Sequence, residues 1–134
     1  YAFTSEGFLR KLKLSEKLKY AVMINFKDFQ DSPSDIEKEL SRFFVPKKNS
    51  KISIVRIAVS FNDAKKTKNA CLFLKKMGYE VYLNLMQSNN KSEKEIKDTC
   101  LSLSKWKSID VLYFADSLGN MTPRDVTEAH KKNI

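Results

Sequence analysis

Apolar residues alternate with polar ones, or run together, in four short stretches of the chain. Each stretch has the length of a β-strand and is bounded by polar residues. The stretches occupy residues 19–26 (KYAVMINF), 52–60 (ISIVRIAVS), 80–87 (EVYLNLMQ) and 110–116 (DVLYFAD). We therefore predict four β-strands.

Each predicted strand is followed by residues with helical periodicity. The clearest case is 63–77, where apolar side chains recur at helical spacing and Gly78 stands where a helix would end. Residues 92–105 form another, because Ser92 and Glu95 have the spacing of a capping box. We predict further helices at 34–44 and, before the first strand, at about 5–14.

The last strand leads into a polar turn, ADSLGNMTPRDV. Asp116 stands at the carboxyl end of the strand, and Thr122 can cap a helix that starts at Pro123 and has Asp125 in its first turn. Loops at this position carry the chemistry of parallel α/β proteins. Asp116 is therefore a candidate functional carboxylate, although a role in satisfying the turn backbone fits it equally well.

The spacing of the strands predicts repeated βα units. Asn25, Ala58, Leu85 and Phe114 lie 33, 27 and 29 residues apart along the sequence. Strand, helix and strand at this spacing require parallel pairing and right-handed crossovers. A doubly wound sheet of flavodoxin type fits this length, whereas a (β/α)₈ barrel needs about 250 residues, so this chain would be half of one.

The two faces of the predicted strands differ in polarity. In 52–60, Val55, Ile57 and Val59 share one face, whereas Arg56, Ala58 and Ser60 share the other. The same alternation puts Asn25, and on the third strand Tyr82, Asn84, Met86 and Ser88, on the more polar face. An open parallel sheet covered by helices on both sides should be apolar on both faces. The pattern favours an α/β fold of parallel βα repeats that is part of a TIM (β/α)₈ barrel.

Arg56 is the unusual residue of this polar face. Burying a guanidinium costs several kcal/mol unless it meets an anion. The partner would be a carboxylate on another strand or an acidic substrate, and the sequence leaves both alternatives open.

Three motifs resemble a known family. VRIAVSFNDA (55–64), GYEVYLNLMQSNNKS (78–92) and VLYFADSLGNMTPRDV (111–126) are similar to strands four, five and six of the metal-dependent aldolase and acyl-lyase barrels. The resemblance is closest to the branch of 4-hydroxy-2-oxovalerate aldolase, and hydroxymethylglutaryl-CoA lyase belongs to the same group. KYAVMINFKDF (19–29) then fits strand three. The resemblance implies that residues 1–134 are a single partial barrel domain of about strands three to six.

The resemblance also implies an activity for the intact parent. In such enzymes Mn²⁺ or Mg²⁺ stabilises the enolate that forms when a carbon–carbon bond next to a keto acid breaks, commonly releasing pyruvate. The metal ligands of the family are an aspartate of the first strand and a His-x-His pair of the seventh, and neither has a counterpart here. His130, the sole histidine, falls on the sixth helix and is not that pair. The segment alone would bind no metal, and the rest of the barrel or an oligomer partner would complete the site.

The same resemblance implies roles for four residues in binding a small keto acid, while no catalytic residue is identified in this segment. Ser88 matches the serine that approaches the substrate carboxylate at the end of strand five. The side chains that would shape the pocket behind it are Arg56, Asn84 and Asp116.

Composition leaves two other classes to consider. The net charge of +9 raises the alternative of a basic nucleic-acid-binding domain, but the lysines are spread over the polar faces of predicted helices. A non-catalytic, flavodoxin-like α/β binding module is the other. Cys71 and Cys100 fall inside predicted helices, which predicts buried thiols in a reduced, cytoplasmic protein. No apolar run approaches the ~18 residues of a membrane span.

Overall fold

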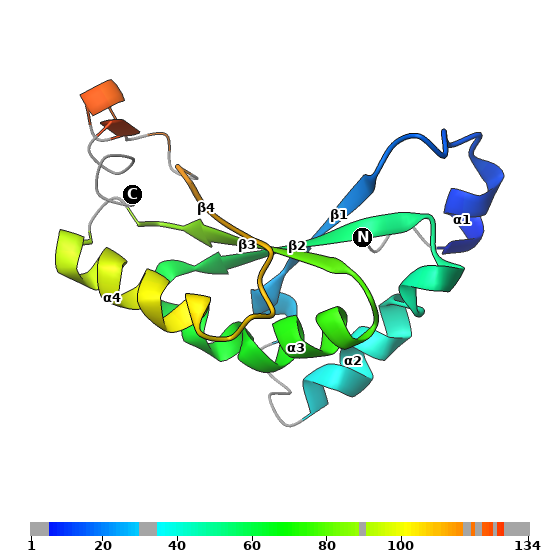
Figure 1. Ribbon diagram of the computed structural model, residues 1–134, viewed down its shortest axis with the longest axis horizontal. Helices are drawn as coiled ribbons and strands as arrows, with labels where there is room; N and C mark the ends of the chain where they lie inside the picture. The colour runs from blue at the N-terminus through cyan, green and yellow to red at the C-terminus, as the bar shows by residue number, and fades with distance from the viewer. Residues whose placement is uncertain are drawn as a thin grey trace.

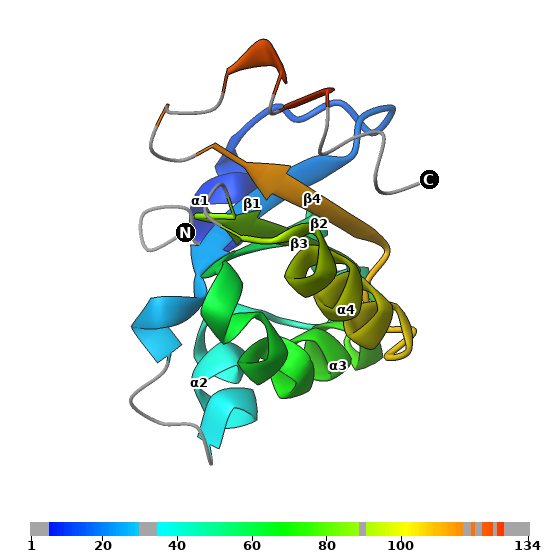
Figure 2. The same ribbon diagram turned by 90° about the vertical axis from the view of Figure 1, so that its left-hand side faces the viewer.

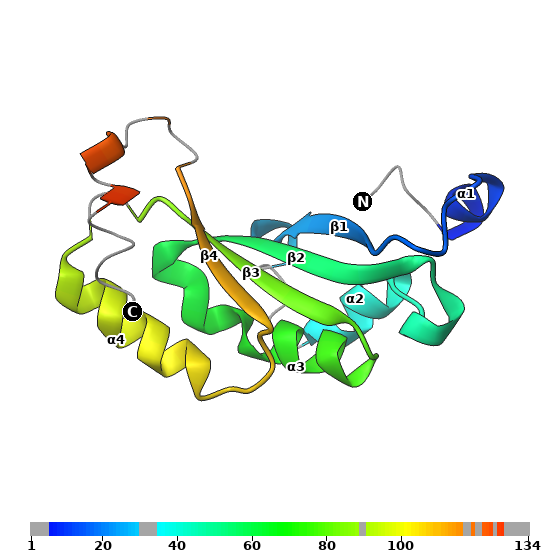
Figure 3. The same cartoon turned by 45° about the horizontal axis from the view of Figure 1, so that its top comes forward.

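A computed structural model describes residues 6–29, 35–88, 91–116, 119, 122–124 and 126–127 of the chain. Its centre is a four-stranded sheet, shown in Figures 1 and 3, in which every pair of neighbours is parallel and the strands follow chain order. The strands are β1 (Tyr20–Asn25), β2 (Ile52–Ser60), β3 (Glu80–Met86) and β4 (Val111–Ala115). The predicted α/β fold of parallel βα repeats is confirmed.

Helices alternate with these strands and cover one face of the sheet. Figure 2 shows α2, α3 and α4 together below the strands, and none of these three helices lies over the opposite face. The α-helices are α1 (Glu6–Lys11), α2 (Ile36–Phe43), α3 (Lys68–Lys76) and α4 (Glu93–Ser104). Residues 5 and 34, where two helices were predicted to begin, lie outside the described residues.

Strand order explains why the helices lie on one side. A right-handed crossover places its helix on a face that depends on the direction in which the next strand is added. Here every strand is added in the same direction, so all the crossover helices fall on the same face. A barrel is wound in this way, whereas a flavodoxin-type sheet reverses direction after its first strands. The flavodoxin-type alternative is therefore wrong for the four described strands.

The predicted helix ends are largely confirmed. At the end of α3, Gly78 has φ +94°, and its N–H donates to the Lys75 carbonyl at 2.9 Å while the Tyr79 N–H donates to Leu74 at 3.2 Å. This is the Schellman arrangement, in which a left-handed glycine satisfies the last carbonyls. At the start of α4, the hydroxyl of Ser92 accepts from the Glu95 N–H, and the Glu95 carboxylate accepts from the Ser92 N–H.

The helix predicted at 63–77 begins differently. Residues Phe61–Thr67 form a 3₁₀-helix, and the α-helix starts only at Lys68. The hydroxyl of Thr67 donates to the Ala64 carbonyl at 2.7 Å and so occupies an acceptor that a regular α-helix offers to a backbone N–H. Two shorter 3₁₀-helices are η1 (Phe26–Phe29) and η3 (Lys47–Asn49).

The core lies between the sheet and its helices. Val55, Ile57 and Val81 on the strands are fully or almost fully buried, as are Leu40 of α2 and Leu74 of α3. Val55 and Ile57 stand at positions that the alternation of the sequence assigned to the apolar face of the second strand. Burial of these apolar side chains, which drives folding, therefore takes place on the side of the sheet that faces the helices.

Ion pairs lie where the strands begin. Asp110, just before β4, accepts from the Val81 N–H at 2.8 Å and pairs with Lys75, while Lys19 pairs with Glu80. Burial alone would raise the pKa of Asp110, but the bonds from Lys75 and Val81 and the nearby lysine charges outweigh it and lower that pKa. In parallel barrels the amino ends of the strands serve stability.

None of the helices in the described ranges has both the length and the apolar composition needed to cross a lipid bilayer.

Candidate functional site

The candidate site is the face of the sheet opposite α2, α3 and α4. Strand register sets which side chains stand next to one another there, because neighbours in parallel strands share a face when they pair. One row contains Met23, Arg56, Tyr82 and Val111, and the next contains Asn25, Ala58, Asn84 and Tyr113. We call this surface the open face. Its middle is polar and its two outer strands contribute exposed apolar residues.

Arg56 on β2 is held by Tyr113 on β4. The Nε–H of Arg56 donates to the Tyr113 hydroxyl at 2.7 Å, and the guanidinium carbon lies 5.3 Å from the centre of the tyrosine ring. Arg56 was expected to pair with a carboxylate on another strand or with a substrate. Among the residues that the structure describes its partner is a neutral phenol, and no carboxylate pairs with it. The guanidinium charge therefore has no balancing anion in this part of the chain.

Asn84 lies between these two residues on β3. Register pairs it directly with Ala58 on one side and Tyr113 on the other. Its side chain is only 6% exposed although α2, α3 and α4 lie on the other face, and its Oδ1 is buried without a hydrogen-bond partner. Because Arg56 on β2 bonds to Tyr113 on β4, the two joined side chains span β3, the strand that carries Asn84.

Ser88 and Asp116 lie at the carboxyl edge of the sheet. β3 ends at Met86 and β4 at Ala115, and these two end residues pair with each other. Ser88 is 4% exposed, whereas Asp116 is exposed, and its carbonyl accepts from the Gly119 N–H at 3.3 Å. The strand alternation that was expected to carry Ser88 onto the same face as Asn84 stops before it.

The cause is the backbone at Gln87. Its φ of +59° is left-handed, so the regular alternation of faces ends with Met86. Asn84 stands two residues before the end of β3 and Arg56 four before the end of β2. At about 3.3 Å per residue they lie roughly 7 and 13 Å from the edge where Ser88 and Asp116 lie. The four predicted residues therefore form an inner pair and an edge pair rather than one cluster.

Tyr113 is the member of this site that the sequence did not single out. It was taken only as part of an apolar strand. A partly buried tyrosine usually needs a partner for its hydroxyl, and that general rule was the available signal. Naming Arg56 as the partner requires the register between β2, β3 and β4, which one sequence does not supply.

The described residues do not assemble a metal site. No group of three or more His, Cys, Asp or Glu side chains gathers within the described part of the chain. His130, Ser117 and Asp125 lie outside it. The helix predicted to start at Pro123, with Thr122 as its cap, is supported by a helical bond from the Val126 N–H to the Thr122 carbonyl at 3.1 Å.

The cysteines offer no reactive thiolate. Burial raises the pKa of Cys71 in α3 to about 11, against a smaller lowering by Thr67, and burial also raises the pKa of the half-buried Cys100 in α4. Both thiols are therefore protonated at neutral pH. The prediction of a buried thiol is confirmed for Cys71 and holds in part for Cys100.

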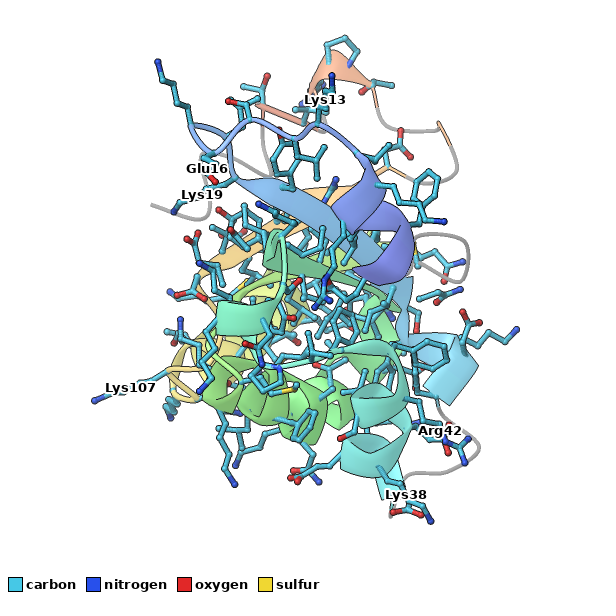
Figure 4. All side chains as sticks on the ribbon, turned by 90° about the vertical axis from the view of Figure 1, so that its right-hand side faces the viewer. Lys13, Glu16, Lys19, Lys38, Arg42 and Lys107 are labelled. Atoms are coloured by element: carbon cyan, nitrogen blue, oxygen red, sulfur yellow. The ribbon has the colours of Figure 1, made fainter. Side chains whose placement is uncertain are left out.

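Cations of the described part of the chain project from different sides of the molecule. Figure 4 shows Lys38, Arg42 and Lys107 projecting outward on the side of the helices, whereas Lys13 and Lys19 project from the opposite half of the molecule. Several cations are also paired with acids, among them Lys38 with Asp35. A nucleic-acid interface would require these charges to line a common groove or face.

Comparisons with known proteins give one structural likeness. No protein-family model matches the chain, and no curated protein matches it. The fold is similar to a crystal structure described as the "N-terminal domain of a putative aldolase from Bacteroides vulgatus", with a TM-score of 0.59 and 26% sequence identity. The likeness covers 85% of this chain and 36% of that one, so this chain spans about a third of the length of the crystallised domain. This likeness supports an aldolase-like fold. It does not identify the particular family that the sequence motifs resemble.

Proposed function

We propose that this chain is a segment of an aldolase-type (β/α)₈ barrel in an enzyme that cleaves or forms a carbon–carbon bond next to a keto acid. The reaction would resemble that of 4-hydroxy-2-oxovalerate aldolase. In the cleavage direction the bond between C3 and C4 of a 4-hydroxy-2-oxo acid breaks, and a base takes the proton of the C4 hydroxyl. Protonation of the remaining enolate at C3 gives pyruvate, and C4 leaves as an aldehyde.

The observation that carries this proposal is the polar cluster on the open face of a sheet wound in one direction. In a barrel that face becomes the interior, where buried polar side chains need a functional or structural partner. Arg56 and Asn84 are polar at positions that a purely structural sheet would fill with apolar residues. The structural likeness to the N-terminal domain of a putative aldolase also supports an aldolase-type barrel.

Four residues would bind the substrate. In this proposal Arg56 attracts the carboxylate of the keto acid, since guanidinium forms strong charge-assisted bonds with carboxylates. Asn84 lies beside it, and Ser88 lies at the carboxyl edge where barrel enzymes place their reacting groups. Asp116 stands at the same edge after β4 and would shape the entrance.

A divalent metal is part of the proposed parent but not of the described segment. The described residues offer no cluster of ligands for it, so no step here is derived through Mn²⁺ or Mg²⁺. When bound, such an ion would act as a Lewis acid on the keto-acid oxygens. In the proposal its ligands come from the rest of the barrel or from an oligomer partner.

The test is a pyruvate-release assay on the protein at its full natural length. A panel of 4-hydroxy-2-oxo acids is supplied with Mn²⁺ or Mg²⁺, and pyruvate is followed by its reduction with NADH and lactate dehydrogenase. We expect turnover that falls at least about tenfold in Arg56→Gln, since a bond to a charged group is worth that much. Arg42→Gln is the matched control, because Arg42 lies on α2 and pairs with Glu39.

Two results would remove the proposal. Binding of keto acids without pyruvate release would leave a non-catalytic binding module. Binding of nucleic acid with a steep fall in affinity as salt increases, and no release of pyruvate, would leave the basic-domain alternative.

A further inference from the structure

Tyr113 holds Arg56 at one particular part of its guanidinium group. The Nε–H of Arg56 donates to the Tyr113 hydroxyl at 2.7 Å, and the guanidinium carbon lies 5.3 Å from the centre of the same ring, within range of a cation–π contact. Among the residues that the structure describes, the terminal nitrogens Nη1 and Nη2 have no hydrogen-bond partner. Both side chains are only partly buried. The terminal end of the guanidinium is therefore the part that is left for a ligand.

This arrangement distinguishes two ways of binding a carboxylate. A guanidinium can make the two parallel bonds of a bidentate contact from its side, through Nε and one terminal nitrogen. It can also make them from its end, through both terminal nitrogens. The side-on contact needs the Nε–H, which Tyr113 already uses. The end-on contact is the bidentate contact that remains.

We propose that Tyr113 is a positioning residue that restricts Arg56 to binding the substrate carboxylate end-on. The inference rests on the proposed function, because it takes Arg56 as the carboxylate contact, and it adds which residue orients that contact. A molecule bound at the end of the guanidinium continues the direction of the Arg56 side chain. Side-on binding would turn the same molecule by roughly a third of a turn in the guanidinium plane, because that group is trigonal and planar. Tyr113 therefore determines where the reacting carbons of the substrate lie.

Loss of the Tyr113 hydroxyl should reduce turnover without weakening binding. Tyr113→Phe keeps the ring and removes its oxygen, so the Nε–H is released and the side-on contact becomes available. Substrate still binds, but part of it lies in an unproductive orientation, which lowers kcat and does not raise KM. Misplacement of reacting atoms by about 1 Å can cost on the order of a hundredfold in rate. We expect kcat for pyruvate release to fall about tenfold or more, with KM unchanged or lower.

The chain offers a closely matched control, Tyr82→Phe. Tyr82 pairs with Arg56 in the register of β2 and β3, so it stands on the same open face, and it is likewise partly buried. Its hydroxyl donates to Glu80 Oε2 at 3.4 Å. Tyr82→Phe therefore removes a phenol oxygen next to Arg56 without removing a contact of the guanidinium. Its kcat and KM should remain close to those of the unmodified protein.

A second measurement does not depend on turnover. NMR of the full-length protein with ¹⁵N-labelled arginine follows the Arg56 Nε–H while pyruvate is added, and broadening of the pyruvate methyl signal reports binding separately. With end-on binding the bond to Tyr113 persists, so the Nε–H signal should change little up to saturation. In Tyr113→Phe the same signal should exchange faster with solvent before any ligand is added, and it should shift as pyruvate binds. Tyr82→Phe should behave as the unmodified protein does.

Several outcomes would overturn the inference. A large, saturable shift of the Arg56 Nε–H in the unmodified protein would mean that the carboxylate displaces Tyr113. An unchanged kcat in Tyr113→Phe, or a rise in KM alone, would mean that the hydroxyl does not orient the substrate. The measurement on the unmodified protein needs no variant, so it decides the question even if Tyr113→Phe fails to fold.

Failure of this inference can be told apart from failure of the proposed function. Pyruvate binding that leaves the Arg56 Nε–H unchanged, without release of pyruvate from any 4-hydroxy-2-oxo acid, would remove the aldolase proposal and leave the end-on contact standing. Release of pyruvate together with displacement of Tyr113 would remove this inference alone. Absence of both binding and release would remove both.

Discussion

Replacing Asn84 by leucine should make the fold more stable. The side chain is 6% exposed and its Oδ1 has no hydrogen-bond partner, so the folded state carries a desolvated acceptor that water satisfies in the unfolded chain. An unpaired buried polar group of this kind costs about 1–3 kcal/mol. Leucine branches at the same carbon and has no polar atom to leave unpaired.

The expected gain is smaller than the whole of that cost. Leucine is the larger side chain, and Arg56 and Tyr113 must adjust above it, which opposes part of the benefit. We expect the free energy of unfolding to rise by roughly 1–2 kcal/mol. For 134 residues this raises the melting temperature by about 4–7 °C.

Urea and thermal unfolding followed by circular dichroism measure this change. The matched control is Leu85→Asn, one position along the same strand, where the side chain faces the helices and is 0% exposed. That substitution should lower the free energy of unfolding by about 3 kcal/mol or more, because it removes apolar burial and adds an unpaired amide. If Asn84→Leu instead lowered stability by about 1 kcal/mol, Oδ1 would be bonded in the unliganded protein. The argument that the folded protein carries an unpaired buried acceptor at Asn84 would then fail.

Further predictions concern the helix ends and the amino edge of the sheet. Ser92→Ala removes the capping box with Glu95 and should lower the free energy of unfolding by about 1 kcal/mol, measured by urea unfolding; no change would mean that the cap is redundant. Gly78→Ala should cost about 1–2 kcal/mol in the same assay, since φ is +94° there, and a neutral result would contradict the left-handed conformation. Asp110 has a lowered pKa, so its contribution to stability is present above its ordinary value of 3.8 and is lost as the pH falls through the lowered pKa. The stability difference between the unmodified protein and Asp110→Asn should therefore be largest near neutral pH and shrink in acid, and a difference independent of pH would refute the pairing with Lys75.

The sequence predicts those parts of the fold that depend on residues close together in the chain. Alternation of apolar residues located β2 at its observed bounds, Gly78 ended α3, and Ser92 began α4, because each signal depends on residues close together in the chain. The 3₁₀ start of the helix after β2 was missed because it depends on how the Thr67 hydroxyl bonds.

The candidate site was predictable only in part, because its contacts join residues that are far apart in the sequence. Arg56 and Asn84 stand out as polar residues in apolar strands, and strand parity puts them on one face. Their contacts depend on residues far apart in sequence: Arg56 meets Tyr113 across an intervening strand, 57 positions away. Ser88 was predicted to share a face with Asn84, which assumed that the strand alternation continues to residue 88. The left-handed backbone of Gln87 ends that alternation one residue earlier.

The open face links the fold to the proposed chemistry. Met23 and Val111 stand at the two ends of the row that contains Arg56, and they are 51% and 37% exposed. In the proposed barrel, further strands would continue the sheet beyond both edges and the open face would become the interior. Closure would bury these outer residues and exclude water from the centre, and a lower dielectric there strengthens every interaction with the guanidinium. The proposed barrel and the proposed substrate contact of Arg56 therefore support each other: without closure Arg56 would be a partly hydrated surface cation, and without an anion the closed interior would hold an unbalanced charge.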